Sequence, residues 1–282
     1  MNTNLSSDSD PRSSAFTLVE LVVVIGMVTL GALMLVPALA RTRTNSPALQ
    51  CMNNARQIAR GWTMYAEDNG GALAPNSDGS SAGKTITSPA WVAGWLDYTS
   101  SMDNTNTLML VDHDRYPYGA FLGAYVGKSA TVFKCPGDHS TVLAGGVATP
   151  RARSISMNSY VGNPSRTWTT PSKYTLCKKM PQVLRPADMF VTLDEHEDGI
   201  NDGCFLTDPD TLYQLIDYPA SYHVNAGGLS FADGHSEIHK WIDPRTRPLP
   251  LSGVPLTLNV NLPGDKDVLW IAQHAAGVSV YP

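Results

Sequence analysis

The pattern of apolar and polar positions starts with a polar segment and then an apolar run from Phe16 to Val36, in which the single charge is Glu20. About 20 apolar residues, rising about 1.5 Å each, cross the roughly 30 Å of membrane hydrocarbon. The run therefore predicts a transmembrane helix over about residues 16–36. A carboxylate inside such a helix costs about 2.5–3.5 kcal/mol, so Glu20 needs a partner. Cleavage after Ala15 would supply one, because the new amino group of Phe16 would lie one helical turn away; the amine of a neighbouring subunit is the other candidate.

A second helical pattern covers about residues 48–68. Ala55, Ile58, Trp62 and Tyr65 recur at helical spacing and form one apolar stripe, which needs another element to cover it. Residues 69–71, Asn-Gly-Gly, end the pattern. Alternation over residues 154–158 predicts a strand, and residues 265–275 predict a short helix capped by Asp265 or Asp267. We expect the sheet of the head to cover the apolar stripe.

Residues 223–241 predict a β-hairpin, because Asp233-Gly234 suits a two-residue turn with positive φ at both positions. Pairing Ala232 with His235 would place Phe231 opposite Ser236 and Leu229 opposite Ile238, on an apolar face. The other face would carry His235, Glu237, His239 and Trp241. Two imidazoles and a carboxylate, completed by His223, are plausible zinc ligands. The alternative is a solvated or loop-covered face, with His223 hydrogen-bonded to the turn backbone.

Composition narrows the class of protein. With 282 residues and 43% hydrophobic residues, the chain can build one substantial globular head. A net charge of −5 argues against nucleic acid as a partner. We find no G-x-S-x-G, H-E-x-x-H, phosphate-loop or G-x-G-x-x-G motif, so we expect no enzymatic activity.

The four cysteines form no C-x-x-C pair, and an even number in an oxidising compartment favours disulfides. Of three connectivities, the preferred one joins Cys51 to Cys135 and Cys177 to Cys204; buried free thiols are the alternative.

An acidic segment over residues 194–203 is a second candidate metal site. Its carboxylates belong to Asp194, Glu195, Glu197, Asp198 and Asp202. Oxygen ligands around glycines suit calcium, although this is no EF-hand because the twelfth position is Phe205. The alternative is a solvated surface loop.

Two ends of the chain resemble one family. The string AFTLVELVVVIGMVTLGALMLVPALA resembles the prepilin-type N-terminal cleavage/methylation domain shared by type IV pilins and the pseudopilins of type II secretion systems. The segment CMNNARQIARGW and the spacing of His223 from Asp233 and Gly234 resemble the H-X9-DG subgroup of these proteins. The resemblance implies that prepilin peptidase cleaves after Ala15, that Phe16 becomes N-methylated, and that Glu20 guides assembly.

The resemblance also implies an α+β, pilin-like fold: a long N-terminal transmembrane helix packed on an antiparallel β-sheet head with loop-rich insertions. The expected parts are a leader (1–15), an N-terminal helix (16–69, membrane span about 16–36 and amphipathic continuation about 48–69) and a globular head (70–282).

The implied function is that of a structural subunit of a type IV pilus or type II secretion pseudopilus. Its partners would be the inner membrane, other pilin-like subunits, prepilin peptidase and the secretion or pilus assembly machinery. It would be a single-pass inner-membrane protein with a periplasmic head, and would reach the cell surface when assembled. The alternatives are a membrane-anchored or secreted surface protein that binds a ligand or metal, and a metal-dependent enzyme using His223, His235 and His239.

Overall fold

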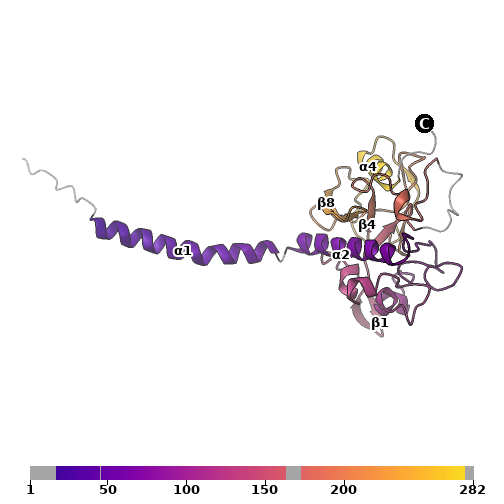
Figure 1. The fold of residues 1–282 in the computed structure, drawn as a ribbon, viewed down its shortest axis with the longest axis horizontal. Helices are drawn as coiled ribbons and strands as arrows, with labels where there is room; N and C mark the ends of the chain where they lie inside the picture. Colours follow the sequence, from indigo (N-terminus) through magenta and orange to yellow (C-terminus); the bar gives the residue numbers. More distant parts are fainter. Residues whose placement is uncertain (1–16, 45, 163–172, 277–282) are drawn as a thin grey trace, which may run out of the picture. The chain divides into compact units, whose positions relative to one another are not determined.

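The computed structural model describes residues 17–44, 46–162 and 173–276, and no side chains for residues 32 and 34–44. The chain divides into two compact units, Met1–Ser46 and Pro47–Pro282 (Figure 1). Ala15 and Phe16, the expected cleavage and methylation positions, lie outside the described residues.

The first unit contains α1 (Leu18–Thr44), whose described side chains are all exposed. Within the part of the chain that the structure describes, no helix is sufficiently long and apolar to cross a membrane. The described apolar segment, residues 18–31, covers about 21 Å at about 1.5 Å per residue, which is short of the roughly 30 Å of hydrocarbon. The predicted fold class, with its long transmembrane helix, is therefore wrong. The structure agrees only with the coarser prediction that the chain combines helices with a β-sheet.

The second unit begins with α2 (Pro47–Asp68), which confirms the second helical pattern. Proline is favoured at the first helical position because its missing N–H would have no intrahelical partner there. Ala55, Ile58 and Trp62 are buried, and Trp62 has no exposed surface. Tyr65 lies at the margin of this stripe, edge-on to the rings of Phe121 and Tyr125. The stripe is thus covered by the head.

A five-stranded sheet in the order β5-β3-β4-β7-β8 forms the centre of this unit. Its strands are β3 (Ile155–Asn158), β4 (Phe190–Asp194), β5 (Cys204–Phe205), β7 (Ala226–Phe231) and β8 (Ser236–Lys240). All pairs are antiparallel except β3 with β5, which is parallel. Every residue of the central strand β4 is buried, as expected for a strand with neighbours on both sides and layers on both faces.

Two helices pack on opposite faces of the sheet. On one face, the Ser236 hydroxyl donates to the Met52 carbonyl of α2. On the other, Trp270 of α4 (Lys266–Ala275) stacks on His239 of β8 with ring centroids 3.8 Å apart. The predicted cap of α4 is confirmed, because the Asp265 carboxylate accepts hydrogen bonds from two backbone amides of its first turn.

Short elements fill the rest of the head. They are η1 (Met102–Asn104), α3 (Leu108–Val111), η2 (Ala124–Val126), η3 (Ala130–Phe133), η4 (Met180–Gln182), the hairpin β1 (Thr141–Ala144) with β2 (Val147–Pro150), and the pair β6 (Gln214–Leu215) with β9 (Val260–Asn261).

The hairpin of β7 and β8 is present, but its predicted register is wrong by one residue. Ser236 pairs with Ser230 instead of Phe231, and Ile238 pairs with Gly228 instead of Leu229. The turn places only Gly234 at positive φ, 92°, so it is not the two-residue type I′ turn. A shift of one residue exchanges the faces of a strand. Leu229 consequently shares a face with Glu237, and Ile238 lies on the face that α2 covers.

Candidate functional site

Glu20 is bound to the start of its own helix. Its Oε2 accepts hydrogen bonds from the Thr17 backbone N–H at 2.9 Å and from the Thr17 hydroxyl at 2.7 Å, and the Glu20 N–H lies 3.3 Å from that hydroxyl. This reciprocal pair is a capping box, which satisfies amides at a helix start that have no intrahelical partner. The carboxylate therefore has a local role that the sequence pattern did not reveal.

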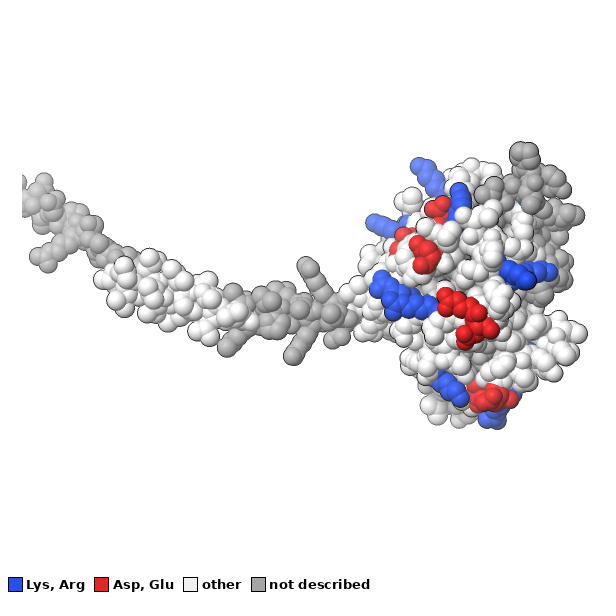
Figure 2. Space-filling view, viewed as in Figure 1, with Lys and Arg blue, Asp and Glu red and all other residues white. Residues whose placement is uncertain are grey.

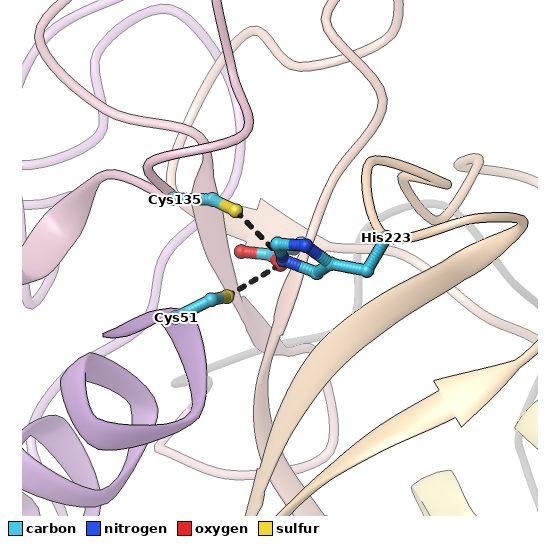
Figure 3. A group of neighbouring side chains, drawn as sticks. Cys51, Cys135 and His223 are labelled. Atoms are coloured by element: carbon cyan, nitrogen blue, oxygen red, sulfur yellow. Dashed lines mark hydrogen bonds and ion pairs between the residues drawn. The ribbon is translucent and has the colours of Figure 1, made fainter. Parts of the chain in front are cut away.

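A second site brings together four side chains from distant parts of the chain (Figure 3). Cys51 lies near the start of α2, Cys135 follows η3, Asp194 ends β4, and His223 lies in the turn before β7. One ligand atom from each lies within 4.8 Å of those of the other three. Within the described residues, this is the one group of at least three His, Cys, Asp or Glu that meets this criterion. It is a candidate metal-binding group.

The four side chains contact one another directly. The Cys51 thiol donates to Asp194 Oδ2 at 2.8 Å, and Cys135 Sγ lies 3.1 Å from His223 Nε2. His223 Nε2 and Asp194 Oδ2 are 3.9 Å apart. Two backbone amides support the group, because Gly228 donates to Asp194 Oδ2 at 2.9 Å and Gly137 donates to Cys135 Sγ at 3.3 Å. The other carboxylate oxygen, Asp194 Oδ1, is buried without a protein partner.

Two glycines make room for this arrangement. A Cβ at Gly228 would lie 2.5 Å from Cys51 Sγ and 3.1 Å from Asp194 Oδ2. A Cβ at Gly137 would lie 2.9 Å from the Tyr222 side chain and 3.3 Å from the His223 ring. Only residues without side chains therefore let α2 and the Cys135 loop approach the strand end so closely.

The turn that carries His223 is strained. Val224 has φ of 56° and Asn225 has φ of 64°, both left-handed. This conformation is unusual for a β-branched residue, and such outliers persist where the surrounding structure determines them. The Val224 side chain is 86% exposed, so its own packing does not explain the conformation. The strained turn holds the His223 ring toward the two thiols and the carboxylate.

Burial and proximity keep the group low in charge when no cation is bound. The neighbouring Cys135 thiol, burial and the Asp194 charge raise the pKa of Cys51 well above its ordinary value. Although the hydrogen bond with Cys51 lowers the pKa of Cys135, burial and Asp194 outweigh it and raise that pKa. Burial raises the pKa of Asp194 to about 6 and lowers that of His223. A bound cation would oppose the raised pKa values, because it favours the thiolates and the ionised carboxylate, and it would bind the neutral imidazole that burial already favours.

The predicted disulfides are absent, since all four cysteines are free thiols. Cys51 and Cys135 do lie together, as their predicted pairing required, but as members of the four-residue group. The Cys177 thiol donates instead to the Gln182 carbonyl at 3.3 Å. Cys204 lies in β5, where burial raises its thiol pKa.

The acidic segment does not converge on one point. Asp194 belongs to the four-residue group, whereas Asp198 accepts from the amides of Leu251 and Gly253, and Asp202 accepts from those of Gly79 and Cys204. Glu195 and Glu197 are also buried. The segment is therefore neither the predicted calcium loop nor a solvated surface loop; two of its carboxylates bind loop backbone within the head.

His235 and His239 lie apart from His223. They line a different pocket, of about 320 Å³, together with Glu237, Trp270 and His274. His235 pairs with the Asp233 carboxylate at 2.6 Å, and His239 with Glu237 at 3.2 Å. The predicted zinc set of His223, His235, His239 and Glu237 is thus divided between two places, and only His223 joins the candidate metal-binding group.

No protein-family model matches the chain, and no curated protein or solved structure matches it.

The sequence points to all four members of the candidate group, but for three separate reasons. Cys51 and Cys135 are the predicted disulfide, Asp194 belongs to the acidic segment, and His223 belongs to the signature motif. The spacing of the signature now has a structural meaning. His223 precedes β7 and Asp233-Gly234 follows it, so the nine intervening residues are that strand with its flanking turn residues.

Proposed function

We propose that this chain is a structural, non-catalytic subunit of a type IV pilus or type II secretion pseudopilus, which assembles through α1. The observation that carries the proposal is the continuous exposed apolar surface of residues 18–31. Leu18 is 78% exposed, Met27 69% and Leu30 60%. Soluble monomers rarely expose contiguous apolar patches of this kind unless the patch contacts a partner.

The chemistry of α1 favours identical or similar helices as that partner. Glu20 is the one charged residue among the described side chains of α1, and no charged side chain of α1 is visible in Figure 2, whereas both signs of charge are interspersed over the head. Apolar helices that bundle together remove this surface from water at about 25 cal/mol per Å². Gly26 and Gly31 have open space where a Cβ would be, so a neighbouring helix can approach there.

The proposal gives Glu20 a second role beyond its capping box. Its charge would neutralise the amino terminus of a neighbouring subunit, created when prepilin peptidase removes residues 1–15 at the inner membrane. The head would then lie in the periplasm and, in an assembled pilus, at the cell surface.

Two substitutions separate the charge of Glu20 from its capping role. Glutamine can also close a capping box, so Glu20→Gln keeps the hydrogen bonds to Thr17 and removes only the charge. Glu20→Ala removes both. If the charge drives assembly, both variants fail to form sedimentable filaments or to support secretion. Glu67→Gln is the matched control, because Glu67 is an exposed glutamate of α2 and assembly should be unchanged. Normal assembly by Glu20→Gln would contradict the proposed role of the charge.

A second candidate is a surface protein that binds a ligand or metal, and the four-residue group favours it. In that case neither Glu20 variant would affect delivery of the head, whereas changes at the group would abolish binding. We do not extend either proposal to calcium, because two thiols are poor ligands for a cation that prefers oxygen.

A further inference from the structure

We propose that Cys51, Cys135, Asp194 and His223 form a structural zinc centre that fastens the start of α2 to the end of β4. The inference is independent of the proposed function, since it concerns the head and requires no filament.

The ligand types select the metal. Thiolate and imidazole ligands suit zinc, and the combination of two sulfurs, one nitrogen and one carboxylate oxygen can complete a tetrahedral shell. Calcium and magnesium require shells made mainly of oxygen. Three of the four candidate ligands are thiols or an imidazole, so the chemistry of the group is that of a softer ion.

The distances suit a tetrahedral ion. With Zn–S about 2.3 Å, Zn–N about 2.0 Å and Zn–O about 2.1 Å, ligand atoms of a tetrahedron lie roughly 3.3–3.8 Å apart. The structure has 2.8 Å between Cys51 Sγ and Asp194 Oδ2, 3.1 Å between Cys135 Sγ and His223 Nε2, and 3.9 Å between His223 Nε2 and Asp194 Oδ2. Of these three edges, two must lengthen and one must shorten, each by less than about 1 Å, and the other three edges of the tetrahedron are at most 4.8 Å.

Independent features of the site point to a bound cation. Asp194 Oδ1 is the second oxygen of the carboxylate whose Oδ2 lies beside Cys51 and His223. It has no hydrogen-bond partner although Asp194 is only 2% exposed, which is costly unless a cation neutralises this carboxylate. Gly228 and Gly137 remove the side chains that would otherwise fill the space around the two sulfurs. The strained turn at Val224 aims the His223 ring at the same point.

The site is structural in character and not catalytic. Four protein ligands occupy all positions of a tetrahedral ion, so none remains for water or substrate. The ligands join segments that are far apart in sequence: Cys51 and Asp194 are 143 residues apart, and Cys135 and His223 are 88 apart. An ion here crosslinks α2, the Cys135 loop, β4 and the turn before β7. Because the ligands converge only in the folded chain, binding stabilises the fold.

Solvent approaches one wall of the site. A pocket of about 540 Å³ opens beside Cys135 and is lined by Asn53, Asn54, Lys134 and Asp138, among others. Cys135 itself has no exposed surface, so this pocket brings solvent to the wall of the site and not to the sulfur.

The test measures zinc in the full chain, purified in mild detergent because α1 is apolar. The protein is stripped with a chelator under reducing conditions, reloaded with zinc, desalted and analysed by elemental mass spectrometry. His223→Ala and Cys135→Ser remove ligands. The matched controls are Cys177→Ser, a buried free thiol outside the group, and His235→Ala, a histidine of the other pocket. Far-UV circular dichroism confirms that each variant is folded.

We expect about one zinc per wild-type chain and per control chain, and below about 0.1 in the ligand variants, because loss of a ligand weakens zinc binding by at least about 100-fold. Cobalt(II) in place of zinc should give the intense visible absorption of a tetrahedral thiolate site, absent in Cys135→Ser. Two results would overturn the inference: no zinc in the folded wild-type chain, or unchanged zinc in folded His223→Ala. A Cys51–Cys135 disulfide that persists in protein prepared without added oxidant would also overturn it, since a disulfide leaves no thiolate for the ion.

Discussion

Gly228→Ala offers a graded test of how closely the zinc centre is packed. The added methyl group would lie 2.5 Å from Cys51 Sγ, whereas ordinary contacts are about 3.5–4.0 Å. Cys51 must therefore move by about 1 Å. Metal–ligand distances tolerate only about 0.2 Å, so this shift removes Cys51 from the coordination shell. Overpacking alone costs about 1–3 kcal/mol.

The expected magnitude depends on zinc. At free zinc about 1,000 times the dissociation constant, the ion adds about 4 kcal/mol to the free energy of unfolding. Gly228→Ala should therefore lower that free energy by about 1–3 kcal/mol in chelator and by about 5–7 kcal/mol in zinc. Urea unfolding followed by tryptophan fluorescence measures both values. Gly199→Ala is the control, because a Cβ there would lie 3.5 Å from its nearest neighbour, in ordinary contact.

Equal losses for Gly228→Ala in chelator and in zinc would refute the link between this glycine and the metal. No loss in either condition would refute the steric argument itself.

Three further predictions concern the head. Trp62→Ala, at a fully buried position, should lower the free energy of unfolding by about 3–5 kcal/mol in urea titrations, whereas the exposed Met64→Ala should change it little; equal effects would contradict the assignment of the α2 face. Burial raises the pKa of Asp202 from 3.8 to about 6, and because this folded-state pKa exceeds the unfolded one, the stabilisation is present below pH 4 and is lost as pH rises through about 6. At about 1.36 kcal/mol per pKa unit the full effect is about 3 kcal/mol, of which about 2.4 kcal/mol falls between pH 4 and pH 7. The stability of the wild type relative to Asp202→Asn should fall by this amount, and a difference that does not change with pH would contradict this. Asp265→Ala should cost about 1 kcal/mol by loss of the α4 cap, measured by thermal unfolding, and an unchanged midpoint would show that the cap is dispensable.

Sequence patterns predicted correctly those helices and strands whose formation depends on residues close together in the chain. The apolar stripe of Ala55, Ile58 and Trp62 predicted α2, and the alternation around Met157 predicted β3. Asp265 marked the start of α4. Each of these signals depends on neighbours within a few residues, so the rest of the fold does not alter it.

The geometry of the turn between β7 and β8 could not be derived from the pair Asp233-Gly234 alone. Asp-Gly is compatible with turns of different length, and the register of β7 and β8 depends on which one forms. The transmembrane prediction failed for a different reason. It counted apolar residues as far as Val36, whereas the part of the chain that the structure describes contains no helix that meets the length and hydropathy of a membrane span.

The candidate metal-binding group could be assembled only in three dimensions. Cys51, Cys135, Asp194 and His223 show no ligand spacing, since each comes from a different element. The sequence did indicate that Cys51 and Cys135 meet, but their pairing was attributed to a disulfide. Only the sheet order, which places the end of β4 beside β7, reveals the carboxylate and imidazole that accompany them.

X-ray absorption at the zinc edge tests the metal centre most directly. For the reloaded full chain we expect two sulfur neighbours at about 2.3 Å and two nitrogen or oxygen neighbours at about 2.0–2.2 Å. A shell made only of nitrogen and oxygen, or one with six neighbours, would contradict the assignment of Cys51 and Cys135 as ligands.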